Sequence, residues 1–311
     1  MLISVVIPTY NRKAILEKCL LALENQVFDS RDVDYEIIVV DDGSTDGTPD
    51  WIRANSKAFS HLKLIEQAHG GPAAGRNLGV ENASGEIIVF IDSDLVVTKK
   101  FLSSHLKGLI KYWNRSGDKL CFTYGSVINT SNFDDPSSEP HKLRDLSWAY
   151  FATGNVAIDR KTLLASGLFD VNFTLYGWED LELGERLRYM GVELLKCPEA
   201  VGYHWHPSFK IDQMSHLIRI EKERAKMGLV FYKKHPTLRV RFIIQFTILH
   251  RFLWELLTLF GLINDKSMKP FLAFLIRKGY PGIAIEIFRL HLNRIGVIQL
   301  YKEARASSLI G

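Results

Sequence analysis

The chain has 311 residues, of which 47% are hydrophobic and 24% are charged, a balance that excludes a disordered protein and allows a sizeable core. Its three cysteines (Cys19, Cys121 and Cys197) are odd in number and widely spaced, which argues against a disulfide framework or a zinc site. The apolar run Leu2–Ile7 has no basic residues before it, so it predicts a first strand rather than a signal peptide. We therefore expect a cytoplasmic protein with reduced thiols.

Short apolar runs rich in β-branched residues predict the first four strands, which are Ile3–Ile7, Tyr35–Val40, Leu62–Glu66 and Glu86–Ile91. Helical patterns lie between them, at Lys13–Asn25, Thr48–Ser56 and Gly75–Ala83. Strands that alternate with helices and read as continuous apolar runs indicate a mostly parallel sheet covered on both faces.

The second half of the chain has a less regular pattern. We predict strands at Leu120–Asn129, Phe151–Ile158 and Glu193–Cys197, and a helix at Trp178–Met190. Asn132–His141 is polar and predicts a loop. The sheet is therefore expected to be mixed, in an α/β fold of Rossmann-like organisation flanked by helices.

Polar or glycine-rich segments follow each of the first four strands: PTYNR after the first, DDGSTDG after the second, HGGPAAGRN after the third and DSD after the fourth. Parallel strands end at one edge of a sheet, and ligands of such sheets bind beyond that edge. A surface loop explains any one of these segments, but four at one edge indicate a binding site.

Asp92 and Asp94 of the DSD segment directly follow a buried-type strand. Two carboxylates at this spacing suit a hard divalent cation such as Mg²⁺ or Mn²⁺. An isolated DxD is more often a turn that caps a helix, so the motif depends on its context.

The segments DDGSTDG and HGGPAAGRN do not fit other common binding motifs. In a calcium loop beginning at Asp42, Arg53 would occupy the position that requires a bidentate Glu. HGGPAAGRN permits close backbone approach at Gly71 and offers Arg76 to a phosphate. Neither a dinucleotide fingerprint nor a P-loop is present.

In this order and spacing, PTYNR, DDGSTDG, GGPAAGRN and DSD resemble the family 2 glycosyltransferases, which have the GT-A fold. The resemblance is close over the first ~100 residues and continues to Pro207. It implies an inverting transfer from a nucleotide-sugar donor, with Mn²⁺ or Mg²⁺ as cofactor.

The resemblance also implies roles for individual residues. Thr9, Tyr10, Arg12 and Asp41 would line the nucleoside pocket, with Asp41 facing the base. Arg76 would lie near the diphosphate, Asp92 would hold the ribose or a metal-bound water, and Asp94 would bind the metal directly. The complete set expected to bind the nucleotide sugar is Pro8, Thr9, Tyr10, Arg12, Asp41, Asp42, Gly71, Arg76, Asp92 and Ser93.

Acidic residues open the helix predicted at Trp178–Met190, where capping is their ordinary use. By resemblance, Asp180 is the base that removes the acceptor's proton, with Glu179 beside it. His204 would complete the metal shell after Asp92 and Asp94, with His206 as the second choice.

Gly154, Asn155 and Trp178 are expected on the acceptor side, although a tight turn explains the TGN segment equally well. The acceptor would be a glycan, a lipid-linked molecule or another hydroxyl compound, and we expect no nucleic acid. Processive members of the family that this sequence resembles carry a Q-x-x-R-W motif after the acidic pair. That motif is missing here, so the resemblance implies one sugar per encounter. Two alternatives remain: a catalytically silent GT-A scaffold at a membrane, and a sugar-1-phosphate nucleotidyltransferase, which would carry a glycine-rich segment where PTYNR stands.

We expect a catalytic domain at residues 1–239, with a nucleotide-binding half at 1–100 and an acceptor half at 101–239. Residues 240–311 form a tail with 10 Lys and Arg against 4 Asp and Glu. Val240–Ile263 predicts a helix with Arg241, Gln245, Arg251, Glu255 and Thr258 on one arc, and Phe242, Phe246, Leu249 and Leu253 on an apolar face. Pro281–Arg305 predicts another. The tail would pack on the catalytic body or a second subunit, or lie on an anionic membrane at its cytoplasmic face.

Overall fold

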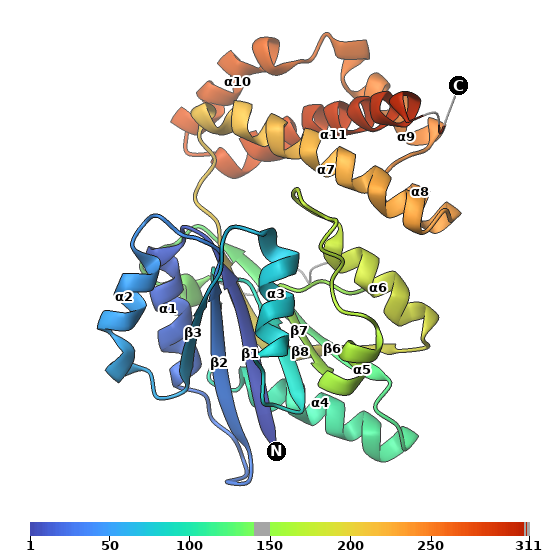
Figure 1. Cartoon of the computed structure of the whole chain (residues 1–311). Helices are drawn as coiled ribbons and strands as arrows, with labels where there is room; N and C mark the ends of the chain where they lie inside the picture. Colours follow the sequence, from blue (N-terminus) through green and yellow to red (C-terminus); the bar gives the residue numbers. More distant parts are fainter. Residues whose placement is uncertain (140–149, 308, 310–311) are drawn as a thin grey trace. The chain divides into compact units, whose positions relative to one another are not determined.

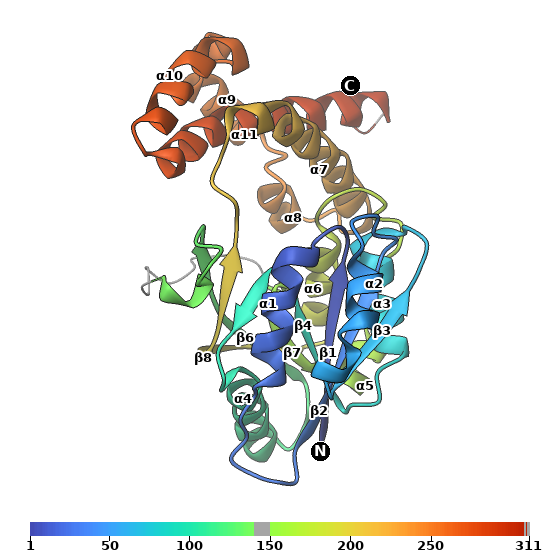
Figure 2. The ribbon, with the colours of Figure 1, turned by 90° about the vertical axis from the view of Figure 1, so that its left-hand side faces the viewer.

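We describe the fold from a computed structural model, which describes residues 1–139, 150–307 and 309. The chain forms two compact units (Figures 1 and 2). The sheet unit comprises Met1–Asn172 and Glu179–Pro207, and the helical unit comprises Phe173–Trp178 and Ser208–Gly311. This division by contact differs from the sequence-based division at 239/240, which kept residues 208–239 with the sheet.

The sheet unit contains one eight-stranded mixed sheet in the order β3-β2-β1-β4-β7-β6-β8-β5. The strands are β1 Leu2–Thr9, β2 Asp34–Asp41, β3 Leu62–Glu66, β4 Ile87–Ile91, β5 Leu95–Val97, β6 Cys121–Thr130, β7 Asn155–Asp159 and β8 Glu193–Trp205. Strands β1 to β4 are parallel, β7 is antiparallel to both β4 and β6, and β8 is parallel to β6. This confirms the α/β fold with a mixed, mostly parallel sheet.

Helices cover both faces of this sheet, because alternate residues of its strands are buried on opposite sides. Ile3, Val5 and Ile7 pack with α1, α2 and α4 on one face, whereas Val6 packs with α3, α5 and α6 on the other. The helices of the unit are α1 Lys13–Glu24, α2 Thr48–Ala54, α3 Gly71–Glu81, α4 Phe101–Ser116, α5 Arg160–Ala165 and α6 Glu179–Tyr189, with short 3₁₀ turns η1 Ser56–Ala58 and η2 Pro136–Ser138.

Several boundaries differ from the sequence-based prediction. Helix α3 begins at Gly71, four residues before the predicted start, because Pro72 fits the first turn of a helix. Strand β7 begins only at Asn155, and β8 continues eight residues beyond Cys197. The predicted loop 132–141 contains η2, and its last two residues lie outside the described part of the chain.

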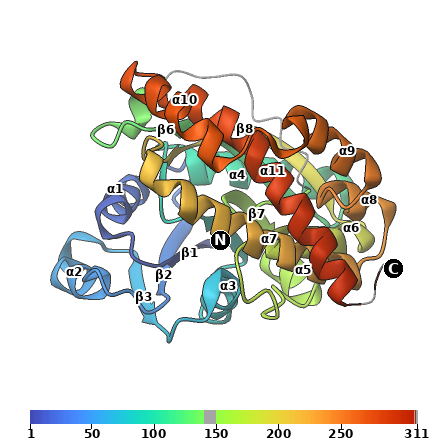
Figure 3. The same ribbon diagram turned by 90° about the horizontal axis from the view of Figure 1, so that it is seen from above.

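The helical unit is built around α11 Pro281–Ala306, against which α7 Met214–Lys234, α9 Ile248–Leu257 and α10 Asp265–Arg277 pack (Figure 3). It also contains α8 Leu238–Ile243, η3 Ile211–Gln213 and η4 Leu259–Gly261. Its core includes Phe209, Met268, Leu272 and Phe288. Across the described residues, no helix is both long and apolar enough to cross a membrane.

The prediction of one helix over Val240–Ile263 is wrong. The segment forms α8 and α9 with a break between them, where Gln245 has a φ of 61°. Thr247 then caps α9 by accepting a hydrogen bond from the His250 N–H. The second predicted tail helix matches α11 within one residue.

Candidate active site

Strand pairing brings the DSD segment beside a histidine that is 110 residues away. Asp92 and Asp94 follow β4 directly, and β5 begins at the next residue, Leu95. Leu95 is paired with His204 of β8, and the Trp205 N–H donates to the Asp94 carbonyl at 2.9 Å. The antiparallel β5–β8 pair therefore fixes His204 next to Asp94.

Asp92, Asp94 and His204 form a group in which one ligand atom from each residue lies within 4.8 Å of the others. His204 Nε2 lies 2.8 Å from Asp94 Oδ1, and Arg12 Nη1 lies 3.6 Å from Asp94 Oδ2. Burial favours a higher pKa for Asp94, but the hydrogen bond with His204 lowers it below the usual value. Two carboxylate oxygens and one imidazole nitrogen are a donor set that fits Mn²⁺ or Mg²⁺ with coordination positions left open.

His206 lies behind His204 rather than in this group. Its Nε2 is 3.1 Å from His204 Nδ1, and burial followed by the charge of His204 lowers the pKa of His206 to about 4. A neutral His206 can accept a hydrogen bond from the His204 Nδ1–H, which leaves His204 Nε2 directed at Asp94.

A buried arginine connects the two acidic segments of the site. Arg76 Nη1 lies 2.9 Å from Glu179 Oε1, and Arg76 Nη2 lies 3.4 Å from Asp92 Oδ1. Arg76 and Glu179 are both buried. Sequence reasoning expected Arg76 near a diphosphate; in the structure its guanidinium is taken up by these two carboxylates, which it holds in place.

Asp180 differs from its neighbour Glu179. It is half-buried and accepts a hydrogen bond from the Leu181 N–H at 2.8 Å. Burial, followed by the charge of Glu179, raises the pKa of Asp180 to about 7. A carboxylate with such a pKa can exchange a proton near neutral pH, as a general base must.

At the carboxyl ends of β1 and β2, two buried oxygens have no hydrogen-bond partner among the described residues: Thr9 Oγ1 and Asp41 Oδ1. The other carboxylate oxygen of Asp41 accepts from the Ser44 N–H at 2.9 Å. Buried oxygens without donors are rare and costly, so Asp41 Oδ1 is available to an N–H of a ligand. The exposed ring of Tyr10 lies 4.5 Å from the ring of His69, centroid to centroid and tilted by 33°. His69 was not singled out from the sequence.

Asp42 organises the glycine-rich segment after β3. Its carboxylate accepts hydrogen bonds from Gln67 Nε2 and from the N–H groups of Gly70 and Gly71, at 2.6, 2.7 and 2.9 Å. Gly71 has a φ of 85°, which favours glycine. The Asp42 carboxylate is therefore already hydrogen-bonded to backbone and side-chain donors of the protein itself.

Pro8 and Ser93 contribute to packing at the same edge. A methyl group at Gly75 would lie 3.3 Å from Pro8 Cβ, so α3 approaches β1 closely there. Ser93 is buried, and its carbonyl accepts from the Cys19 thiol at 3.2 Å.

The residues expected on the acceptor side occupy different environments. Gly154 lies against the group formed by Asp92, Asp94 and His204, since a Cβ at Gly154 would be 3.0 Å from Asp92 Oδ2. Asn155 is completely buried, and its amide bonds to His105 and to the carbonyls of Ser126 and Ala200. Asn155 is thus part of the core of the sheet unit.

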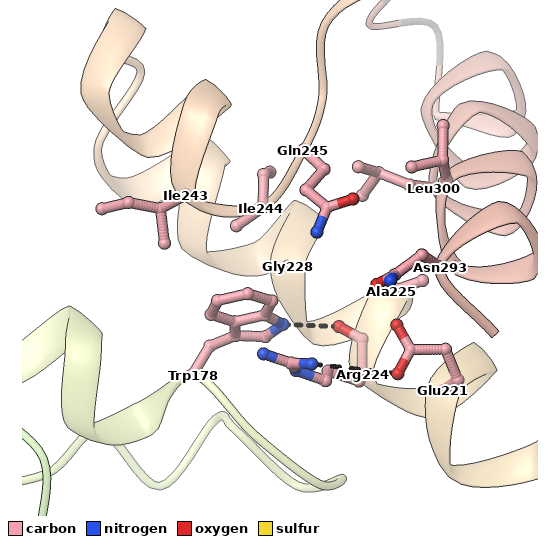
Figure 4. Close-up of a pocket in the computed structure, with 12 residues that line it drawn as sticks. Trp178, Glu221, Arg224, Ala225, Gly228, Ile243, Ile244, Gln245, Asn293 and Leu300 are labelled. Atoms are coloured by element: carbon pink, nitrogen blue, oxygen red, sulfur yellow. Dashed lines mark hydrogen bonds and ion pairs between the residues drawn. The ribbon is translucent and has the colours of Figure 1, made fainter. Parts of the chain in front are cut away.

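Trp178 belongs to the helical unit, although it directly precedes Glu179 (Figure 4). Its indole N–H donates to the Arg224 carbonyl at 2.7 Å, and the Arg224 guanidinium lies 4.3 Å from its ring. Gly228 leaves room for the indole, because a Cβ there would be 3.3 Å from Trp178 Nε1. The ring lines a pocket of the helical unit together with Glu221 and Gln245.

Comparison with known proteins agrees with this fold and site. Residues 4–150 match the sequence model of glycosyl transferase family 2, and this part of the chain belongs to that family. The resemblance found in the sequence motifs is thereby confirmed.

Related proteins have moderate sequence identity to this chain. An uncharacterized glycosyltransferase, YfnE of Bacillus subtilis, is 29% identical over 66% of this chain and 65% of its own length. The chondroitin synthase of Escherichia coli is 30% identical over 67% of this chain and 35% of its own. The chain thus spans between about one third and two thirds of the length of these relatives.

Solved structures show the same fold at low identity. Staphylococcus aureus TarS residues 1–349 align with a TM-score of 0.53 and 17% identity, covering 99% of this chain and 92% of that chain. The Pyrobaculum calidifontis mannosyltransferase PcManGT, solved with GDP-Man and Mn²⁺, aligns with a TM-score of 0.54 and 18% identity, covering 99% and 75%. The fold is therefore GT-A.

Proposed function

We propose that the chain is a glycosyltransferase that moves one sugar from a nucleoside diphosphate sugar to a hydroxyl acceptor with inversion. The observation that carries this proposal is the grouping of Asp92, Asp94 and His204 at the edge where the carboxyl ends of β1, β2 and β4 meet. Asp180, with its raised pKa, supplies the base that such a site requires.

In this proposal, Asp94 and His204 bind the metal ion directly and Asp92 completes the group or holds the ribose. A bound Mn²⁺ or Mg²⁺ would neutralise the charge that develops on the departing diphosphate. The half-exposed guanidinium of Arg12, 3.6 Å from Asp94, can contact a phosphate oxygen. His206 keeps His204 in the orientation that the metal requires.

The donor is proposed to be a UDP-sugar. Asp41 Oδ1 is buried and has no hydrogen-bond partner among the described residues, which suits an imide N–H of a base. Tyr10 directly follows Thr9, which is paired with Asp41, and its ring lies 4.5 Å from that of His69. TarS was solved with UDP-GlcNAc, whereas PcManGT was solved with GDP-Man, so both bases occur among the structural neighbours.

The proposed transfer accounts for each bond that forms or breaks and for the proton of the acceptor. The acceptor oxygen forms a bond to the anomeric carbon while the bond from that carbon to the diphosphate oxygen breaks. Asp180 takes the proton of the acceptor hydroxyl, and the nucleoside diphosphate leaves with the bonding electron pair. Arg76 contacts both Glu179 and Asp92 and so restrains the two carboxylates.

A donor screen tests the proposal. The full chain is incubated with UDP-, GDP-, CMP- and dTDP-sugars, with Mn²⁺, with Mg²⁺ or with EDTA, and release of the free nucleotide is measured. We expect metal-dependent release from a UDP-sugar, lost in Asp94→Ala and kept in Asp50→Ala, whose side chain is 88% exposed. Failure of every donor to bind or turn over would instead favour a catalytically silent scaffold.

A further inference from the structure

Helix α9 of the helical unit is oriented the opposite way from a normal amphipathic helix: its apolar side faces away from the protein. Its outward large residues are between 39% and 79% exposed: Ile248, Leu249, Phe252, Leu253, Leu256 and Leu257. Such a helix in a globular protein normally buries its apolar stripe. We call these six residues, with Leu259, Phe260 and Leu262 of the following turn, the α9 apolar face.

The polar side of α9 makes the contacts with the rest of the helical unit. Glu255 Oε2 lies 2.9 Å from Arg294 Nε of α11, and the Arg251 guanidinium lies 5.2 Å from the Tyr301 ring. The Trp254 indole N–H donates to Gln245 Oε1 at 2.6 Å, and Thr258 is fully buried. Helix α9 packs against α11 (Figure 3), and these side-chain contacts fix its rotation, so the apolar face is a stable feature of the unit.

The turn after α9 extends this surface at a conformational cost. Leu259 and Phe260 have φ values of 49° and 53°, in a region that ordinary side chains rarely adopt. Their side chains are 53% and 67% exposed, so burial within the chain does not offset the strain. Strain of this kind persists where an interaction outside the element compensates for it.

The net charge of the helical unit distinguishes between two possible partners of the α9 apolar face, a second copy of the chain and an anionic surface. Residues 208–311 carry 18 Lys and Arg against 7 Asp and Glu, a net charge of +11, whereas residues 1–207 carry 21 against 28, a net charge of −7. The only acidic residue of α9, Glu255, is paired with Arg294. Two copies meeting through such a unit would repel each other, whereas an anionic surface would attract it.

We propose that the α9 apolar face inserts into the headgroup region of an anionic lipid bilayer, with the basic residues of the helical unit drawn to the lipid charges. A bilayer surface accepts apolar side chains without demanding a complementary shape, and lipid binding then depends on both burial and Coulomb attraction. This inference concerns the helical unit alone and does not depend on the proposed transfer reaction.

The test uses the full chain and sedimentation with vesicles of phosphatidylcholine alone or with 30% phosphatidylglycerol. We expect binding to the anionic vesicles, weaker binding to neutral ones, and weakening as salt rises from 50 to 500 mM. The variant L249Q/F252Q/F260N should bind anionic vesicles at least ~100-fold more weakly, because three apolar side chains no longer enter the bilayer.

A matched control and a stability measurement separate lipid binding from misfolding. The variant L21Q/V171Q/Y189Q removes side chains of similar exposure (47%, 55% and 59%) from the sheet unit and should bind as the wild type does. Phe260→Asn alone should keep or raise the melting temperature, because Asn tolerates a positive φ better, and still weaken vesicle binding.

Three results would overturn the proposal. These are unchanged binding by the α9 triple variant, equal binding to neutral and anionic vesicles, and a wild-type dimer in buffer that the triple variant abolishes while vesicles are not bound.

Discussion

The two units of this protein use polar and apolar residues in opposite ways. The sheet unit buries its apolar strands between two layers of helices and gathers carboxylates at one open edge, where their charges carry the proposed chemistry. The helical unit directs the polar side of α9 inward and the apolar side outward, and it is strongly basic. We infer that the sheet unit is organised around a bound ligand and the helical unit around a lipid surface.

The largest effect is expected where the two units meet in sequence, just after Trp178. Asp180→Asn keeps the shape of the side chain but removes its basicity, so turnover should fall by ~10²–10⁴ while donor affinity is kept. The matched substitution in the helical unit, Asp212→Asn, should leave turnover unchanged. Steady-state kinetics measures both, and a normal Asp180→Asn with an inactive, folded Glu179→Gln would reverse the assignment of the two carboxylates.

A second difference concerns acid stability. His105 is buried in the sheet unit between Thr123 and Asn155, and burial lowers its pKa to about 4. The unfolded chain therefore binds a proton that the folded chain excludes, so stability is full above pH 6.5 and is lost as pH falls toward 4, by ~3 kcal/mol. Urea unfolding should show this slope reduced in His105→Gln but unchanged in His216→Gln, an exposed histidine of the helical unit. Identical slopes in wild type and His105→Gln would contradict the prediction.

His206 should have a smaller effect, because it acts through His204. His206→Phe removes the acceptor 3.1 Å from His204 Nδ1 and should weaken Mn²⁺ affinity by ~10–100-fold without abolishing it. His206→Gln can restore the hydrogen bond and should recover much of the affinity. Titration calorimetry with Mn²⁺ distinguishes this positioning role from direct ligation, for which both variants would lose binding to the same extent.

The pH dependence of turnover gives the finest test of Asp180. With a pKa raised to about 7, the basic form decreases tenfold for each pH unit below 7, so kcat/KM should rise with pH to about 7 and then level off. Vesicle binding through the helical unit should not follow this profile. A value of kcat/KM that does not change between pH 5 and 7 would exclude Asp180 as the general base.

The sequence predicted the sheet edge well, because strand endings and their polar segments lie close together in the chain. Asp92 and Asp94 were found this way. The position of His204 depends on the pairing of β5 with β8, which no local pattern shows. Asn155 was assigned to the acceptor side from the local TGN segment. Its three buried hydrogen bonds have no local sequence signal, because their partners lie between 29 and 50 residues away.

The tail shows a different limit of sequence analysis. The amphipathic pattern of α9 was visible, but a pattern does not state which side faces the protein. Only the contacts of Glu255 and Trp254 show that the polar side does. The break at Gln245 was also missed, because a positive φ in a glutamine has no sequence signal.

The central claim is that the group of Asp92, Asp94 and His204 binds a donor through a divalent metal ion. Titration calorimetry of the nucleoside diphosphate from the active donor, with Mn²⁺ and with EDTA, tests it most directly. We expect tight binding only with Mn²⁺ in the wild type and no metal-dependent increase in affinity in Asp94→Ala. The wild type and Asp94→Ala should have equal melting temperatures in the presence of EDTA. Equal affinity with and without Mn²⁺ in the wild type, or an undiminished increase in Asp94→Ala, would contradict it.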